Sequence, residues 1–184
     1  MPGIKIADGT VVDTGLLQDA EGRLVLSPSS ANTQLHPTAL VEVPGIVTAS
    51  IYVAGDAVGT IFTFGGVPKQ GTIQTGVYLD KDDEGIETDI IIFNKAITSV
   101  ADHDPFGVSD ADLDSLVGTI TFSTFLDLIN NQSSVASGLF LTYTAPEETL
   151  FVQMVTRGTP SIAASNLPQF RLTILSHSLY TGSS

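Results

Sequence analysis

From about residue 40 onward, hydrophobic and polar positions follow a pattern typical of β-strands. Runs of about five to eight residues, rich in β-branched and aromatic side chains, are separated by Gly, Pro and Asp turn signals. These runs cover residues 58–64, 72–79, 89–93, 118–122, 139–143, 150–155 and 170–175. Many short strands divided by turns predict an all-β fold, and we expect a β-sandwich of jelly-roll type.

The run at residues 89–93, Asp-Ile-Ile-Ile-Phe, does not alternate. A strand with one face in water alternates apolar and polar side chains, whereas a strand covered on both faces is apolar throughout. This run is therefore expected to be a strand with both faces covered.

Two segments carry helical signals. In residues 109–117, Ser109 can cap a helix and Asp112 stands three residues later, where a capping box has an acidic residue. Apolar residues at the spacing i, i+3, i+4 would give this helix one hydrophobic face. A further short helical turn is possible at residues 125–129. We expect one short helix on an otherwise all-β domain.

Residues 1–40 differ from the rest, because their apolar clusters are short and separated by polar turn signals. None is long enough to build a sheet layer alone. We expect an extended N-terminal arm, or a pair of loose hairpins, that becomes ordered against a partner. A terminus without a role is the alternative. The predicted domains are the arm, residues 1–40, and a β-sandwich, residues 41–184.

The charge balance is strongly acidic. Seven Lys and Arg residues face 20 Asp and Glu residues, for a formal net charge of −13. This field has the wrong sign for nucleic acid or anionic membranes, so we expect no partner of either kind. The chain has no cysteine, which excludes disulfides, a thiol nucleophile and Cys-ligated metals. We also see no apolar secretory leader and no apolar stretch of about 18 residues that would span a membrane.

Two acidic segments have oxygen ligands at the alternate positions that calcium favours. The first contains Asp80, Asp82 and Glu84, and the second is the Asp-x-Asp-x-Asp run at residues 110–114. Neither has a glutamate at the twelfth position of a calcium loop, where the first has Ile91. Solvated acidic segments are the favoured interpretation, and Asp80, Asp82 and Glu84 are kept as weak calcium candidates. No other metal or cofactor is expected.

Two short motifs suggest catalysis. Residues 13–15, Asp-Thr-Gly, match the short aspartic-protease signature, but that chemistry needs two carboxylates that share a proton, and no second copy exists. His103 between Asp102 and Asp104 resembles an oriented base, but no serine in a nucleophile elbow accompanies it. Turns are the favoured interpretation of both segments. No nucleophile, base and orienting group can be assembled, so we expect no catalytic residue and no enzymatic activity.

The middle of the chain, roughly residues 50–155, resembles a group of small virion proteins of tailed bacteriophages. The matching segments are VAGDAVG at 53–59, the strand at 71–80, TDIIIFN at 88–94, TSVAD at 98–102, PF at 105–106 and SDADL at 109–113. The resemblance implies a structural protein of the head decoration or cement type, and it brings no catalytic residues.

From this resemblance we expect a protein that binds and stabilises the major capsid protein lattice, as a homotrimer or another cyclic homo-oligomer. It would be made in the host cytoplasm and located on the capsid surface of the virion. Two alternatives stay open. One is a tail, baseplate or head-fibre component, which would be present in few copies. The other is a carbohydrate-binding β-sandwich for adhesion, which would bind glycans.

Overall fold

The computed structural model describes residues 34–47 and 50–177, and four two-residue strands nearer the N-terminus. Those strands form two antiparallel pairs: β1 (Ile4–Lys5) with β2 (Val11–Val12), and β3 (Leu17–Gln18) with β4 (Leu24–Val25). Thr33–Ser178 form one compact unit, and Met1–Asn32 with Leu179–Ser184 form another. The Asp-Thr-Gly motif at 13–15 lies outside the described residues.

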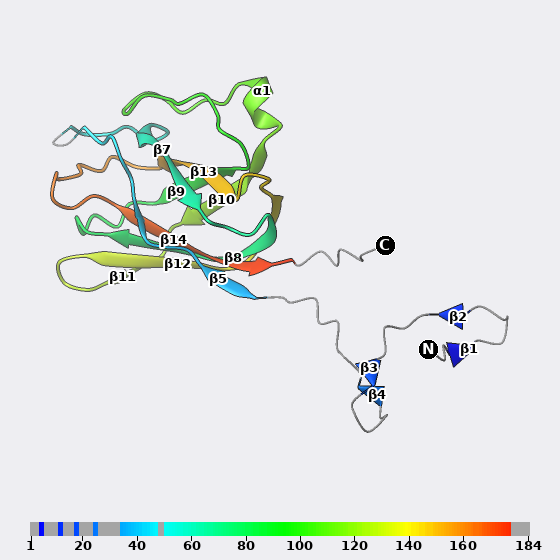
Figure 1. Ribbon diagram of the computed structural model, residues 1–184. Helices are drawn as coiled ribbons and strands as arrows, with labels where there is room; N and C mark the ends of the chain where they lie inside the picture. Colours follow the sequence, from blue (N-terminus) through cyan, green and yellow to red (C-terminus); the bar gives the residue numbers. More distant parts are fainter. Residues whose placement is uncertain are drawn as a thin grey trace. The chain divides into compact units, whose positions relative to one another are not determined.

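The larger unit is a sandwich of two antiparallel sheets (Figure 1). The four-stranded sheet has the order β10 (Leu116–Phe122), β9 (Thr88–Phe93), β13 (Thr149–Thr156) and β7 (Ala57–Gly65). The six-stranded sheet has the order β11 (Phe125–Asp127), β12 (Gln132–Thr144), β8 (Gln70–Asp80), β14 (Gln169–Ser176) and β5 (Leu35–Pro37), and β6 (Val41–Glu42) also pairs with β14.

The strand order of the larger unit is that of a jelly roll. If the short strands β6 and β11 are set aside, the first strand pairs with the last, β5 with β14. The second pairs with the second to last, β7 with β13, and the two remaining pairs are β8 with β12 and β9 with β10. A long hairpin rolled up on itself gives this pairing, and its result is a double sheet. The predicted all-β, jelly-roll-like β-sandwich is confirmed.

Each run predicted as a strand lies in a strand of the sandwich. The run at 139–143 is only the second half of β12, which begins at Gln132. Its first half is rich in Ser, Ala and Gly, residues that favour strands weakly. Pairing with β8 outweighs that preference, with a register shift between Ser137 and Leu141 around Gly138, whose φ is 71°.

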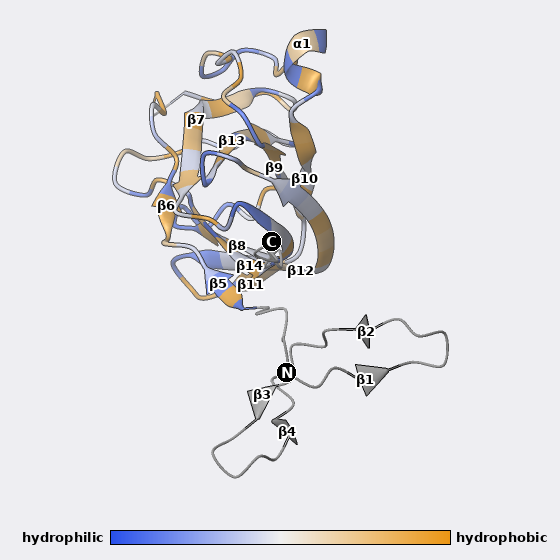
Figure 2. Ribbon diagram, turned by 45° about the vertical axis from the view of Figure 1, so that its right-hand side comes forward, coloured by the Kyte–Doolittle hydropathy of each residue, from blue (hydrophilic) through white to orange (hydrophobic). Residues whose placement is uncertain are grey.

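The predicted helix is shorter than expected. Helix α1 spans Asp110–Leu113, and its cap is as predicted: the Asp112 amide donates to Ser109 Oγ at 3.1 Å. The helix was expected to continue to residue 117, but Leu116 already pairs with Phe93 of β9. Sheet pairing outweighs the helical spacing there, and no residue of α1 is buried. Figure 2 accordingly shows α1 in alternating hydrophilic and hydrophobic colours at one end of the sandwich.

The helical turn expected at residues 125–129 is also wrong. Phe125–Asp127 form strand β11, which pairs with the start of β12, with Phe125 opposite Ser134. A hairpin whose turn is closed by two successive asparagines replaces the helical turn. The local spacing of apolar residues suggested a helix. That spacing carries no information on β12, the strand with which these residues pair.

The core lies between the two sheets and is centred on aromatic rings from both. Phe170 of β14 stacks on Tyr78 of β8, with ring centroids 4.7 Å apart, and contacts Phe122 of β10 at 5.6 Å and Phe62 of β7 at 5.7 Å. Gly76 lies under Phe122, where a Cβ atom would come within 3.0 Å of the ring. The nine Phe and four Tyr therefore include a group that fills the core between the sheets.

The boundary between arm and sandwich stays a prediction at residue 40. Strand β5, inside the predicted arm, already pairs with β14 through His36 and Ile174. The Thr38 amide also donates to the Leu172 carbonyl at 2.9 Å. These contacts make β5 and Thr38 part of the six-stranded sheet.

Candidate functional site

The outer face of the six-stranded sheet is open, and we call it the open face. It consists of the side chains that alternate with core residues on β8, β11, β12 and β14. Register places them in three rows: Leu126, Ser133, Leu79 and Gln169; Val135, Val77 and Arg171; and Ser137, Thr75 and Thr173.

The open face combines apolar and hydroxyl side chains and has almost no charge. Leu126 and Val135 are 63% and 61% exposed. Arg171 is the one charged residue in the three rows, and the first row continues onto β6 with Glu42, which pairs with Gln169 and accepts a hydrogen bond from its Nε2 atom at 3.2 Å. In a chain of net charge −13, the part of this face on β8, β11 and β12 presents apolar and hydroxyl side chains, and Glu42 lies at its β6 edge.

The outer face of the four-stranded sheet is covered over the central strands β9 and β13 and the start of β7, and we call this part the covered face. Its residues Ala57, Phe93, Gln153 and Val155 are at most 2% exposed. The segment between β9 and α1 runs over this sheet (Figure 1) and hydrogen-bonds to it, since the Ala57 amide donates to the Asp104 carbonyl at 2.9 Å. This confirms the prediction that the 89–93 strand is largely covered on both faces.

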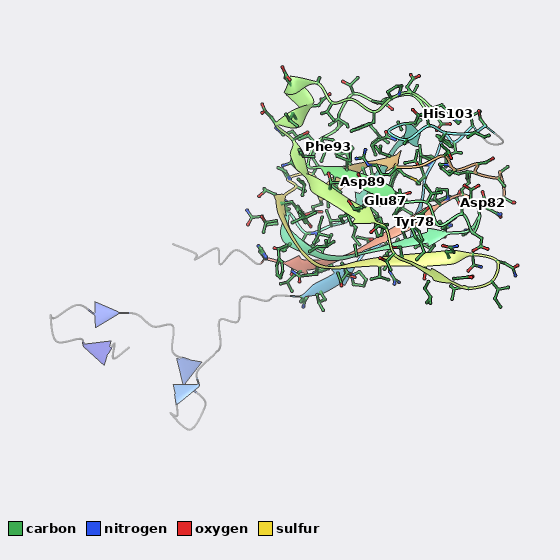
Figure 3. The ribbon with its side chains drawn as sticks, turned by 180° about the vertical axis from the view of Figure 1, so that it is seen from behind. Tyr78, Asp82, Glu87, Asp89, Phe93 and His103 are labelled. Atoms are coloured by element: carbon green, nitrogen blue, oxygen red, sulfur yellow. The ribbon has the colours of Figure 1, made fainter. Side chains whose placement is uncertain are left out.

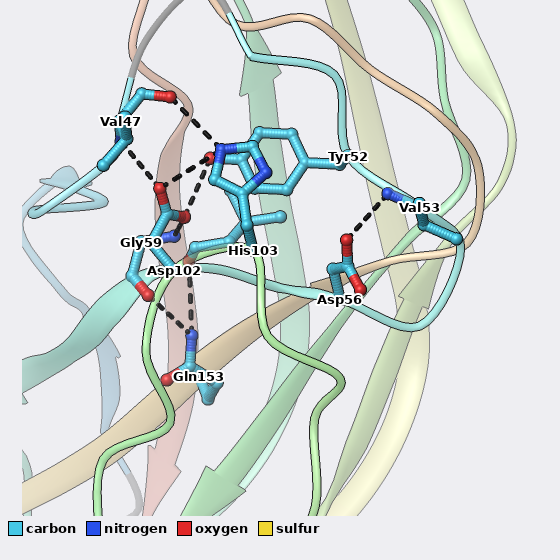
Figure 4. A network of polar contacts seen from close by, with 9 residues as sticks. Val47, Tyr52, Val53, Asp56, Gly59, Asp102, His103 and Gln153 are labelled. Atoms are coloured by element: carbon cyan, nitrogen blue, oxygen red, sulfur yellow. Dashed lines mark hydrogen bonds and ion pairs between the residues drawn. The ribbon is translucent and has the colours of Figure 1, made fainter.

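Asp102 holds the covering segment in place (Figure 4). Its carboxylate accepts hydrogen bonds from the Val47 amide at 2.6 Å, the Tyr52 hydroxyl at 2.8 Å and the Gly59 amide at 2.5 Å. Burial and the Asp102 carboxylate raise the pKa of Tyr52 well above its ordinary value. The single carboxylate thus joins three separate parts of the chain.

His103 belongs to the same network. Its ring stacks on Tyr52 with centroids 3.8 Å apart and planes 10° from parallel. Its Nε2 atom lies 3.3 Å from the Val47 carbonyl oxygen and 3.5 Å from Asp102 Oδ2. These contacts give His103 a packing role, and the expectation that it is not catalytic stays a prediction.

The calcium candidates accept hydrogen bonds from nitrogen donors. Asp80 accepts from the amides of Asp82, Glu84 and Gly85 at 2.8 to 3.1 Å. Asp82 accepts from the side chain of Asn166 at 2.8 Å, and Glu84 accepts from the Ser161 amide. They thereby attach the 80–87 loop to the segment between β13 and β14.

Asp80, Asp82 and Glu84 line a small cavity of about 10 Å³, the size of one water molecule. Burial raises the pKa of Glu84. Among the described residues, no group of three or more His, Cys, Asp or Glu side chains is placed to hold a metal ion. Calcium binding by these three residues stays a prediction, and the geometry gives their carboxylates a structural task.

The second acidic run caps the helix. Asp112 accepts hydrogen bonds from the Ser109 hydroxyl at 2.9 Å and from the Thr98 amide at 3.2 Å. These bonds, chiefly the one from Ser109, lower the pKa of Asp112. The helix-start interpretation of this run is therefore supported by its contacts.

A polar cavity of about 390 Å³ lies at the end of the sandwich where β8 begins and β12 ends. Its lining is mostly uncharged and polar: Gln70, Asn94, Thr142, Tyr143, Thr144 and His177, with Leu116 and Val117. Asn94 Oδ1 and the Tyr143 hydroxyl are buried without a hydrogen-bond partner. Sequence analysis did not group these residues, because they come from distant strands.

The β11–β12 hairpin was also missed. Leu126, Leu128 and Ile129 are all exposed on it. The two asparagines after Ile129 are a turn signal that could have indicated a hairpin.

Comparisons with known proteins give no family. No family model matches the chain, and a search of curated proteins finds no match. Within the described part of the chain, no helix has the length and apolar character needed to span a membrane.

Two chains from solved virus structures align weakly. One, from a marine algae virus of the order Picornavirales, is 9% identical and aligns over 96% of this chain and 85% of its own, with a TM-score of 0.26. The other, from Mud Crab Dicistrovirus, is 10% identical and aligns over 100% and 92%, with a TM-score of 0.23. The fold assignment therefore depends on the strand order and not on these alignments.

Proposed function

We propose that this chain is a structural protein of a virus particle, of the decoration or cement type, that binds the major capsid protein lattice through its open face. The observation that carries the proposal is a sheet face rich in apolar and hydroxyl side chains, with Glu42 at its β6 edge, in a chain of net charge −13. The sequence resemblance to tailed-bacteriophage virion proteins and the jelly-roll strand order support it.

The open face can supply binding energy. Covering apolar surface stabilises a contact by roughly 25 cal/mol per Å² removed from water, before the cost of association. Val77, Leu79, Leu126 and Val135 supply that surface, and the serines and threonines between them can hydrogen-bond. A lattice repeats the contact many times, so a modest energy per copy suffices for stable decoration.

The remaining parts of the proposal follow from the same role. The chain would form a homotrimer or another cyclic oligomer on the capsid surface, and the part of the predicted arm that precedes β5 would order across a neighbouring subunit. The acidic remainder of the surface would keep particles apart in solution. No catalytic residue takes part.

Counting copies in purified particles tests the proposal. Quantitative mass spectrometry should find hundreds of copies, in a fixed ratio to the major capsid protein. A few copies located at one vertex would favour a tail, baseplate or head-fibre component instead. Absence of the chain from particles would overturn the virion role.

A surface variant tests the open face. Val135→Asp places a carboxylate next to Val77 on that face and should lower incorporation into particles about tenfold. Ile51→Asp is the matched control, because Ile51 is similarly exposed at 71% and lies on a loop outside the open face. Equal incorporation of both variants would show that the open face is not the contact.

A second candidate function is carbohydrate binding for adhesion. The polar cavity favours it, because sugar hydroxyls could pair with the accessible polar side chains of Gln70, Thr142 and Thr144 in its lining. A glycan array should then show binding that Thr142→Val weakens. Absence of any glycan bound by the intact chain would exclude this alternative.

A further inference from the structure

The tip of the β11–β12 hairpin presents large apolar side chains to solvent. Ile129 is 85% exposed, more than any other large hydrophobic residue in the described part of the chain, and Leu128 is 49% exposed. Leu126, at the edge of the open face, continues this apolar surface along β11. We call Leu126, Leu128 and Ile129 the apolar tip.

Ile129 is also in an unfavourable backbone conformation. Its φ is 81°, in the left-handed region, where β-branched residues are rare outliers. The other non-glycine residues with positive φ in the described part are Asp83, His103 and Glu148, none of which is β-branched. The turn holds Ile129 there, since its amide donates to Asp127 Oδ1 at 2.7 Å and the Leu128 amide donates to the Asn131 carbonyl at 2.9 Å.

For the isolated chain, isoleucine is unfavourable at position 129 for two reasons. The side chain is exposed, so it contributes no burial of apolar surface, and the backbone is strained. Asparagine accepts the left-handed conformation more readily, and two asparagines follow directly. A residue that departs from local preference without a benefit inside the fold indicates a role outside it.

Acidic residues flank the apolar tip. Asp80 of β8 pairs with Gln132, which pairs with Asp127 next to the tip. Gln132 Nε2 also donates to the Asp83 carbonyl at 3.4 Å, which ties the 80–87 loop to the base of the hairpin. That loop contains five carboxylates and one lysine. Figure 3 shows Asp82 at the same end of the sandwich as the turn of the hairpin.

We propose that the apolar tip inserts into an apolar pocket, rimmed by basic side chains, on a different protein of the particle. A basic rim would complement the negative charge of the 80–87 loop, and an apolar pocket would bury the side chains of Leu126, Leu128 and Ile129. This inference rests on the proposed function only in placing the partner in the particle.

A second copy of the chain does not fit as the occupant. A stable protein–protein contact buries about 800 Å² per partner, far more than three side chains supply. A contact between two tips would also bring two acidic loops together, and like charges in apposition disfavour such a pair. A pocket on a lattice subunit avoids both problems, because the open face adds area to the same contact.

The test compares two substitutions at one position. Ile129→Asn relieves the strain and removes the apolar side chain, so the melting temperature of the isolated full-length chain should rise by roughly 2–4 °C. Its incorporation into particles, assembled in cells that carry the variant gene, should fall about tenfold. Ile129→Leu keeps an apolar side chain and should be incorporated within about twofold of wild type.

Two further variants complete the design. Asp83→Asn removes one flanking charge at a position whose φ of 60° suits asparagine, and it should lower incorporation about twofold. Ile51→Asn removes a similarly exposed isoleucine far along the chain from the hairpin and should change neither the melting temperature nor incorporation.

The outcomes separate this inference from the proposed function. If wild type is abundant in particles and Ile129→Asn is incorporated equally well, the inference is wrong and the proposed function stands. If Ile129→Asn lowers both melting temperature and incorporation, Ile129 is a structural residue and the inference is also wrong. If wild type is absent from particles, the proposed function itself fails.

Discussion

The two sheets of the sandwich are alike in their inner faces and opposite in their outer ones. On the covered face, Phe93, Gln153 and Val155 are at most 2% exposed, and the segment that Asp102 anchors hydrogen-bonds to the sheet at Ala57. On the open face, Val135 and Leu126 are more than half exposed. The first face is partly closed by the chain's own covering segment, whereas the second is open to solvent.

The two outer faces differ because different side chains alternate with the core residues along their strands. The strand at 88–93 is apolar on both sides, so its outer side chains need a cover made by the chain itself. Strands β8 and β12 have Ser and Thr next to their outward apolar residues. The outer face of this sheet can therefore stay exposed to water. A hydroxyl-rich face is thus compatible with both a free and a bound state.

An aspartate placed on each outer face in turn should test this difference between the sheets, and it should have the largest effect on the free energy of unfolding. Val155→Asp buries a carboxylate on the covered face and should destabilise the fold by more than about 4 kcal/mol, or prevent folding. Val135→Asp on the open face should cost less than about 1 kcal/mol. Urea unfolding of both variants measures this, and similar losses would mean that the two faces do not differ as described.

Removal of the anchor of the covered face should have the next largest effect. Asp102→Ala leaves the Val47 amide, the Tyr52 hydroxyl and the Gly59 amide without their acceptor, and should cost about 3 kcal/mol in the free energy of unfolding. Asp104→Ala is the control, since the Asp104 side chain is exposed, and it should cost less than about 0.5 kcal/mol. A loss below about 1 kcal/mol for Asp102→Ala would contradict its anchoring role.

The loop that links the two sheets should give a smaller, pH-dependent effect through Glu84. Because burial raises its pKa, folded Glu84 binds a proton more readily than unfolded Glu84. Its contribution to stability therefore falls as pH rises from its ordinary pKa, near 4.5, through the raised folded value.

Glu84→Gln should remove that dependence. The melting temperature of the variant relative to wild type should be higher at pH 7 than at pH 4.5, because wild type alone bears the cost of a partly desolvated carboxylate at pH 7. Thermal melts across this range measure the difference. A difference that stays constant with pH would show that Glu84 titrates alike in both states.

Calcium should have the smallest effect. The carboxylates of Asp80, Asp82 and Glu84 already accept amide hydrogen bonds, so calcium at millimolar concentration should leave the melting temperature unchanged. A rise that saturates with calcium and disappears in Asp82→Asn would establish the calcium site and change our account of this loop.

Much of the fold could be predicted from the chain because its signals are local. Turn residues and β-branched runs located the main strands, and the Ser109 cap located the helix start. Predictions failed where long-range pairing decided: Leu116 joined β10 instead of the helix, and residues 125–127 became a strand opposite β12. The site was less predictable still, because the open face gathers residues from strands far apart in the sequence.

The sequence by itself determined an all-β sandwich, an acidic molecule and a covered strand at 89–93, because composition and periodicity act over neighbouring residues. Only the tertiary structure decided the jelly-roll strand order, the gathering of apolar and hydroxyl side chains on the open face and the exposure of Ile129. Alternation shows that a strand has two faces, but only the packing of one sheet on the other decides which face is turned to solvent.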